Sequence, residues 1–227
     1  MNTLVVSAHP DDEAFGLGAT IFKHTKQQDK VFLCILCQKV SARLNKPAES
    51  ILKKQTKASA EILGVNNIFY YDFENIKMNT EPRLNIIRSI EEVIEKVKPE
   101  IVYTHSKSDL NIDHRIVFEA TMVAIKLPER KTKKNLKSDL IKQVFCYEVL
   151  SSTEWKDSLS EPYKPNVFVD IEKEMEFKLR AVKQYKEAVK SFPHPRSIEN
   201  IKTLAKYRGM QSGFKFAEAF ELVKLLK

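Results

Sequence analysis

Thr3-Leu-Val-Val-Ser-Ala-His-Pro-Asp-Asp-Glu-Ala-Phe-Gly-Leu-Gly-Ala19 is the stretch that decides the fold of this chain. Its residues 4–6 are apolar, mostly β-branched and uncharged, which predicts a short buried strand. Pro10 interrupts the run, and a helix with apolar periodicity is expected soon after it. His9, Asp11 and Asp12 therefore lie where a strand ends and a helix begins, which is where open α/β sheets bind ligands.

These three side chains suggest a specific chemistry. His9 and Asp12 are three residues apart across a tight turn, so they can converge on one metal ion, with Asp11 as a second carboxylate available as a base. The alternative is an ordinary helix start, because proline in the first turn and acidic residues at the N-terminus are common there. The strand before the motif and the helix after it favour a site.

The rest of the chain alternates strands and helices. We expect strands over about 3–8, 30–37, 68–71, 101–104, 144–149 and 167–169, and helices over about 13–27, 48–63, 83–98, 113–125, 172–190, 198–208 and 216–226. This order predicts an α/β fold, a Rossmann-like, doubly wound and mostly parallel sheet with helices on both faces. A length of 227 residues suits a single domain over 1–227, with a C-terminal helical part over about 172–227.

Composition narrows the class of protein. The sequence shows no signal peptide and no apolar run long enough to span a membrane, so we expect a cytoplasmic protein. Three cysteines fit a reducing compartment. Cys34 and Cys37 lie in an apolar strand, where residues three apart point to opposite faces, so core packing is favoured over a redox or metal role.

The net charge of +8 is concentrated in the lysine-rich residues 126–142. A solvated loop is the simplest interpretation, and a docking surface for an anionic substrate or a membrane surface is the alternative. The run carries no aromatic residues that would stack on bases, so a nucleic-acid partner is not expected. No feature of the sequence predicts an oligomeric state.

A second polar motif, residues 105–115, follows the strand expected over 101–104. In the usual doubly wound order the first and fourth strands are neighbours, so this motif faces the first one and His114 becomes a third ligand beside His9 and Asp12. Two histidines, one carboxylate and an open position describe a catalytic zinc site. Asp113 could orient a ligand. Asp109 or Asn111 could instead be the N-cap of the next helix.

At these residues the chain resembles a known family. His9-Pro-Asp-Asp-Glu13 and Asp109-Leu-Asn-Ile-Asp-His-Arg115 resemble the two signatures of the PIG-L/LmbE-like family of zinc-dependent N-deacetylases. Gln38-Lys-Val-Ser-Ala-Arg43 resembles the family's loop after the second strand. Segments that resemble a bacterial branch are Ser151-Ser-Thr-Glu-Trp155, Phe192-Pro-His-Pro-Arg-Ser197, and Arg208-Gly209 through Ala217-Glu-Ala-Phe220.

The resemblance implies that His9, Asp12 and His114 bind Zn²⁺, or another divalent metal such as Fe²⁺, Mn²⁺ or Co²⁺, and that Asp11 is the general base. It also implies a small-molecule or glycoconjugate substrate carrying a 2-acetamido sugar, usually N-acetylglucosamine. Several members carry a histidine where this chain has Asn111. An amide can donate a hydrogen bond to an oxyanion but not a proton at neutral pH, so the acid would be Asp11, His194 or His105.

Four further residues are candidates for the substrate site. Arg43 and Arg196 could hold an anionic or hydroxyl-rich group, although surface or structural roles are equally typical of arginine. His194 lies between two prolines, which could point it inward. Trp155 could stack on a sugar, but a lone tryptophan more often packs.

Other functions remain open at this point. The same metal site could cleave a different N-acyl amide. A 2-His-1-carboxylate iron oxygenase would use a similar triad, but it typically has a β-rich barrel. A silent nucleotide-binding module is disfavoured, because no G-x-G-x-x-G follows the first strand.

Overall fold

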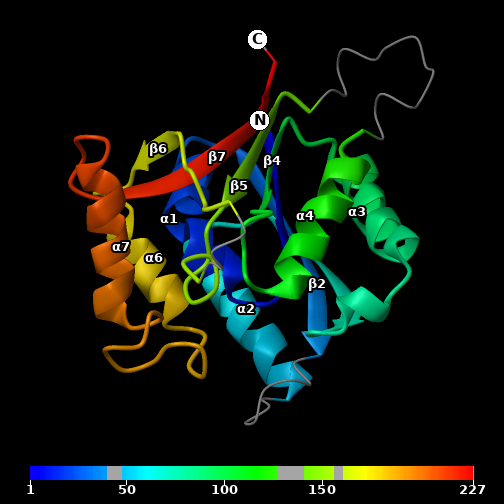
Figure 1. The fold of residues 1–227 in the computed structure, drawn as a ribbon, viewed down its shortest axis with the longest axis horizontal. Coiled ribbons are helices and arrows are strands. Elements are labelled where there is room, and N and C mark those ends of the chain that lie inside the picture. The colour runs from blue at the N-terminus through cyan, green and yellow to red at the C-terminus, as the bar shows by residue number, and fades with distance from the viewer. Residues whose placement is uncertain (40–47, 127–140, 156–160, 227) are drawn as a thin grey trace.

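Parallel strands form the part of the sheet that carries both motifs (Figure 1). The computed structural model describes residues 1–39, 48–126, 141–155 and 161–226. The parallel strands are β1 (Asn2–Ser7), β2 (Lys30–Lys39), β3 (Asn67–Glu74), β4 (Ile101–His105) and β5 (Gln143–Tyr147). A helix crosses over between each strand and the next, which returns the chain to the same edge and makes the pairing parallel.

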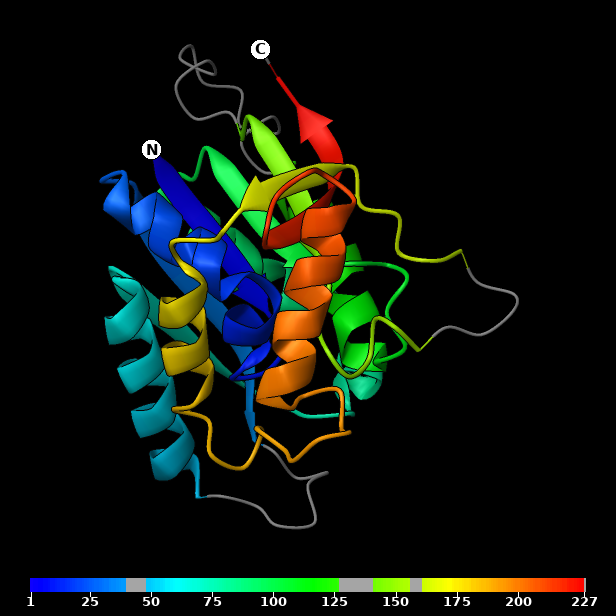
Figure 2. The ribbon, with the colours of Figure 1, turned by 90° about the vertical axis from the view of Figure 1, so that its left-hand side faces the viewer.

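The helices cover both faces of the sheet, as predicted. One face carries α1 (Asp12–Lys26), α2 (Glu49–Leu63), α6 (Met175–Val182) and α7 (Ile198–Met210), and the other carries α3 (Arg83–Val97) and α4 (Ile112–Ala124) (Figures 1 and 2). The buried side chains of α3 recur at helical spacing, and the helix stops at Lys98, in the left-handed conformation, before Pro99. The short 3-10 helix η1 (Met78–Thr80) precedes α3.

The strand order is β3-β2-β1-β4-β5-β7-β6 within the described residues. The chain moves outward from β1 through β2 to β3, then returns to the other side of β1 with β4. This reversal lies between β1 and β4, as expected for a doubly wound sheet, and the carboxyl ends of the strands at such a reversal are where ligands bind in this class of fold. The α/β fold class is therefore confirmed.

The C-terminal part differs from the prediction. Residues 216–226 were expected to be helical, but they form the strand β7 (Ala217–Leu225), which is antiparallel to both β5 and β6 (Val167–Asp170). Alanine, glutamate, leucine and lysine locally favour a helix. The edge of β5 needs hydrogen-bond partners, and pairing with it outweighs that local preference.

The helix expected over 172–190 is also shorter than predicted. It forms only as α6, and the chain then runs through turns to α7, which starts at Ile198. Ser197 accepts a hydrogen bond from the backbone N–H of Asn200, a normal N-cap contact. The C-terminal part is therefore a mixture of two helices and the strand β7.

Cys34 and Cys37 are buried and carry free thiols, as expected for core residues. They were predicted to point to opposite faces, but both pack in the same apolar cluster. Register shifts around Cys37 interrupt the regular alternation of β2, which explains the difference. Most of the lysine-rich residues 126–142 and all of Arg43's loop lie outside the described residues. Among the described helices, none has the length and apolar character needed to cross a membrane.

The position of β7 can be tested at Phe220. Its ring is 1% exposed and lies 5.2 Å from the ring of Tyr103 and 6.2 Å from that of Phe145, measured between centroids. Phe220→Ala should lower the free energy of unfolding by about 3–5 kcal/mol, because it leaves a cavity under the sheet. Val223→Ala, at an exposed position of the same strand, should change it by less than about 0.5 kcal/mol. Chemical denaturation measures both, and equal effects would contradict this packing.

Candidate active site

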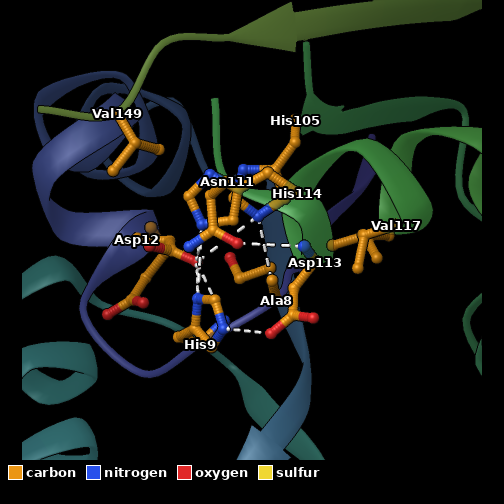
Figure 3. Close-up of polar contacts among 12 residues, drawn as sticks. Ala8, His9, Asp12, His105, Asn111, Asp113, His114, Val117 and Val149 are labelled. Atoms are coloured by element: carbon orange, nitrogen blue, oxygen red, sulfur yellow. Dashed lines mark hydrogen bonds and ion pairs between the residues drawn. The ribbon is translucent and has the colours of Figure 1, made fainter. Parts of the chain in front are cut away.

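Parallel pairing of β1 with β4 brings the two motifs together. Val5 lies opposite Tyr103, so both strands end at the same edge of the sheet. His9 follows β1 by two residues, and the loop after β4 leads to His114 in the first turn of α4. Figure 3 shows the histidine, aspartate and asparagine side chains of the two motifs grouped at this point.

The turn between β1 and α1 holds its carboxylates firmly. Asp12 Oδ2 accepts a hydrogen bond from the backbone N–H of His9 at 2.8 Å. Asp11 is the N-cap residue of α1 and has a φ of 103°, an unfavourable value for a residue with a side chain. Strain of this kind persists only where the surroundings enforce it, and it is frequent at functional sites. The turn therefore presents Asp11 and Asp12 in a fixed arrangement.

Three ligand-type atoms form an equilateral triangle. His9 Nδ1, His114 Nε2 and Asp12 Oδ2 are each 3.3 Å from the other two. Ligand atoms bound at about 2.0–2.1 Å to a tetrahedral zinc ion are roughly 3.3–3.4 Å apart. The three side chains are buried, and Asp12 Oδ1 has no hydrogen-bond partner within the described structure. The donor set and its spacing fit a divalent metal.

Two outer carboxylates orient the two histidines. His9 Nε2 lies 2.9 Å from Asp113 Oδ2, and His114 Nδ1 lies 3.0 Å from Asp109 Oδ2. Each carboxylate favours a proton on the ring nitrogen that faces it. The other ring nitrogen then has a lone pair directed at the centre of the triangle formed with Asp12 Oδ2. Asp113 was predicted to be such an orienting residue, and its position supports that role.

A second group of possible ligands is less suitable. His9, Cys37 and Asp113 also lie within 4.8 Å of one another. The Asp113 carboxylate, however, already accepts hydrogen bonds from the backbone N–H groups of Ile76 and Met78. Burial raises the pKa of Cys37, which disfavours the thiolate that a metal would need. Asp113 therefore acts on His9, and the triangle with Asp12 is the better metal site.

The electrostatics of the centre favour positive charge. Burial opposes the protonated form of His114, but Asp12 and Asp109 outweigh it and raise the pKa of His114 to about 9. Asp12 and Asp113 likewise raise the pKa of His9 well above its ordinary value despite burial. Burial would raise the pKa of Asp12, yet the two imidazoles hold it well below its ordinary range. A dication can replace these protons in the same field.

His105 is buried beside the centre but cannot supply a proton from Nε2. That nitrogen accepts a hydrogen bond from the backbone N–H of Ala8 at 2.9 Å, and a backbone N–H can only donate. Burial, with His114 nearby, lowers the pKa of His105 to about 4. Its ring stacks on His114 with centroids 3.9 Å apart. His105 is thus a neutral packing partner, and it is the least suitable of the three acids considered from the sequence.

Asn111 is the N-cap of α4. Its Oδ1 accepts a hydrogen bond from the backbone N–H of Asp113 at 2.9 Å. The capping role considered from the sequence therefore exists. Because the cap uses the oxygen, the amide nitrogen is the atom that remains as a donor, and Figure 3 shows Asn111 among the side chains around the centre.

The substrate residues proposed from the sequence differ in position. Arg196 lies beside Asp11, with Nη1 3.4 Å from Asp11 Oδ2, and its Nε donates to the carbonyl of Leu150 at 2.8 Å. His194 is exposed and accepts a hydrogen bond from the backbone N–H of Arg196. Partial burial, together with Arg196 and Lys190, lowers the pKa of His194. Trp155 is 63% exposed, so it is not a core residue.

Sequence reasoning missed several supporting residues. Asp109 was considered only as a cap, but it faces His114 and accepts hydrogen bonds from the hydroxyls of Ser152 and Thr153. Glu13 accepts a hydrogen bond from the Tyr185 hydroxyl and another from the backbone N–H of Asp11. The resemblance of residues 151–155 to a family segment was a usable signal for the first group. Nothing local indicated Tyr185, because its contact spans most of the chain.

The orienting role of Asp113 can be tested with Asp113→Asn. The amide can turn its NH₂ group toward His9 Nε2 and so favour a proton on Nδ1, the atom that faces the centre. Metal affinity should fall by about 10–100-fold, the usual cost of losing such a partner. Competition with a chromophoric chelator measures it. Asp72→Asn, at an exposed carboxylate, is the control, and an unchanged affinity in both variants would contradict the assignment.

Comparisons with known proteins identify the family of this chain. The family model PIG-L, described as GlcNAc-PI de-N-acetylase, matches residues 4–125. Diacetylchitobiose deacetylase of Thermococcus kodakarensis is 32% identical over 235 residues, covering 97% of this chain and 82% of that protein. A probable N-acetyl-alpha-D-glucosaminyl L-malate deacetylase 2 of Bacillus anthracis is 23% identical, covering 57% and 62%.

Solved structures share the fold at lower identity. N,N'-diacetylchitobiose deacetylase from Pyrococcus horikoshii superposes with a TM-score of 0.79 at 20% identity, covering 97% of this chain and 83% of that one. GalB, a 4-carboxy-2-hydroxymuconate hydratase from Pseudomonas putida, gives 0.77 at 21% identity, covering 100% and 98%. The matched family residues include both motifs that build the site. This chain is a member of the PIG-L family of de-N-acetylases.

Proposed function

We propose that this protein is a metal-dependent hydrolase that removes the N-acetyl group from a 2-acetamido sugar, of the N-acetylglucosamine type, within a conjugate. The observation that carries the proposal is the triangle of His9, Asp12 and His114, with the Asp11 carboxylate on the adjoining residue. Two relatives, a diacetylchitobiose deacetylase and a probable N-acetylglucosaminyl malate deacetylase, support the substrate class.

His9, Asp12 and His114 would hold Zn²⁺, and the same donors would accept Fe²⁺, Mn²⁺ or Co²⁺. When bound, such an ion supplies Lewis acidity toward the acetamide carbonyl and lowers the pKa of water. Asp113 and Asp109 would keep both imidazoles in the tautomer that binds a cation.

Asp11 is assigned as the general base. It takes a proton from the water that attacks the acetamide carbonyl, and it returns a proton to the sugar nitrogen as the C–N bond breaks. Water and the amide thus give acetate and a primary amine. Arg196 Nη1 lies 3.4 Å from Asp11 Oδ2, and its Nε donates to the Leu150 carbonyl, so this arginine would hold the Asp11 carboxylate in place. His194 on the same loop is the second candidate for the proton donor.

The substrate would meet residues on the loops around the centre. Trp155 is exposed on the loop that follows β5, and its backbone N–H donates to Ser152, which contacts Asp109. We propose that Trp155 stacks on a sugar ring and that Arg43 and Arg196 recognise hydroxyl or anionic groups. We propose that the substrate is a small molecule or a glycoconjugate. We also propose that the protein is cytoplasmic and that residues 1–227 form a single domain.

A different N-acyl amide is the second candidate substrate. The hydratase GalB has the same fold with a different reaction, so the fold alone does not set the chemistry. Acetate release from N-acetylglucosamine, diacetylchitobiose and N-acetylglucosaminyl malate, compared with N-acetyl amino acids, separates the two candidates. Cleavage of the amino acids alone would reject the aminosugar substrate.

Asp11→Asn tests the general base. The substitution keeps the size of the side chain and removes its ability to take a proton, so kcat should fall by about 10²–10⁴-fold. Metal content, measured by atomic emission, should stay at the wild-type value, because Asp11 is not one of the three ligands. Near-normal turnover in a variant that keeps its metal would refute the role.

Asn111 is assigned as the donor to the oxyanion, and its two roles can be separated. Asn111→Ala removes both, so kcat should fall by about 10²–10³-fold and stability by about 1 kcal/mol. Asn111→Asp keeps a capping oxygen and lacks the amide donor, so it should lose activity while its thermal midpoint stays close to that of the wild type. Full activity in Asn111→Asp would show that Asn111 is only a cap.

A further inference from the structure

Helix α1, which begins with Asp12, is broken one and a half turns into its length. Leu17 has φ −142° and ψ 26°, which is not a helical conformation. The helix therefore consists of a first segment, residues 12–16, and a second segment, residues 18–26. In an uninterrupted helix the N–H groups of Ala19 and Thr20 would donate to carbonyls four residues earlier.

A carboxylate from β7 receives these N–H groups instead. Glu218 Oε1 accepts from Ala19 at 3.1 Å, and Glu218 Oε2 accepts from Thr20 at 2.7 Å. Glu218 is 4% exposed. It therefore caps the start of the second segment, where a negative charge is favoured by the helix dipole.

Lys178 forms an ion pair that offsets the free-energy cost of burying the Glu218 carboxylate. Its Nζ lies 2.6 Å from Glu218 Oε1, and the residue is 5% exposed. An isolated buried charge would be strongly destabilising, whereas a paired and hydrogen-bonded one is tolerated. A Cβ on Gly18 would lie 3.4 Å from Lys178 Cγ, so the lysine side chain packs directly against α1 at the break. Three elements, α1, α6 and β7, thus meet at the break.

The first segment packs in a direction of its own. A Cβ on Gly16 would lie 2.5 Å from Cδ2 of Tyr147, so the segment touches the end of β5 directly. The Tyr147 hydroxyl in turn lies 3.2 Å from His105 Nε2 and 3.1 Å from Ser7 Oγ. The direction of this short segment therefore sets where Asp12, its first residue, lies relative to the histidines.

We propose that Glu218, neutralised by Lys178, is a positioning residue for the active site: it holds the break in α1 and so aims the first segment, with Asp11 and Asp12, at the centre. This gives a role to the Ala217-Glu-Ala-Phe220 motif, which the proposed function does not use. The inference rests on the proposed function for the nature of the site, but its contacts do not depend on the substrate.

The test uses the full chain in two altered forms. Glu218→Gln keeps the shape and removes the charge. Lys178→Met combined with Glu218→Leu removes the pair together, which often leaves folding intact, but also removes the cap. Both variants should bind Co²⁺ about tenfold more weakly than the wild type, which is the low end of the effect for groups that orient metal ligands. The affinity is measured by adding Co²⁺ to metal-free protein and following the visible absorption of the bound ion. On an acetylated sugar that the wild type cleaves, kcat should fall with little change in KM.

Asp29→Asn is the matched control. Asp29 lies just beyond the other end of α1 and bonds the N-terminal amine and His24, so its loss should lower the thermal midpoint without touching the first segment. Its Co²⁺ affinity should equal that of the wild type. If this control lost affinity in proportion to its stability, the effect at Glu218 would be general destabilisation and the inference would be wrong.

Amide hydrogen exchange separates this inference from the proposed function. In the double variant, the amides of Ala19, Thr20 and residues 12–16 should lose protection, whereas those of the last turns of α1 should not. Wild-type protection there, or wild-type Co²⁺ affinity in both Glu218 variants, would overturn the positioning role. A wild-type chain that binds no metal would instead refute the proposed function, and the exchange data would still decide the role of Glu218.

Discussion

Parallel pairing between β1 and β4 is the constraint on which the site depends. Neighbouring strands lie about 4.8 Å apart, so residues that leave their carboxyl ends can share one centre. His9 and His114 are far apart in the chain, yet their facing nitrogens lie 3.3 Å from each other and from the same oxygen of Asp12. The apolar core on both faces of the sheet fixes the two strands, and the geometry of the candidate site follows from it.

Two carboxylates outside the three candidate ligands hold the imidazole rings in this arrangement. Asp113 accepts hydrogen bonds from the backbone N–H groups of Ile76 and Met78, next to η1. Asp109 accepts hydrogen bonds from two hydroxyl groups of the loop after β5. Each carboxylate is thereby held where it can direct one imidazole. Buried polar groups stabilise a single structure only when they are satisfied, and these hydrogen bonds satisfy the Asp113 and Asp109 carboxylates. Among the described residues, Asp12 Oδ1 has no hydrogen-bond partner.

Residues of the C-terminal part contact the turn between β1 and α1 and the helix α1 itself. Arg196 meets Asp11, Tyr185 meets Glu13, and Glu218 caps the second segment of α1. All three contacts act on the residues that follow β1. The strands and helices after β5 therefore do more than extend the core, because they hold the turn in which Asp11 is strained. A hydratase has the same fold, so the architecture alone does not set the reaction.

The sequence by itself determined the alternation of elements, the doubly wound sheet and the family, and it predicted the candidate metal ligands. These follow from local signals, namely apolar periodicity and polar motifs at the ends of strands. Tertiary structure decided what those signals do not contain. Residues 217–225 favour a helix locally but pair with β5 and β6, because unpaired strand edges need partners. The roles of Asp109, Tyr185 and Glu218 likewise depend on contacts between distant parts of the chain, which no local pattern encodes.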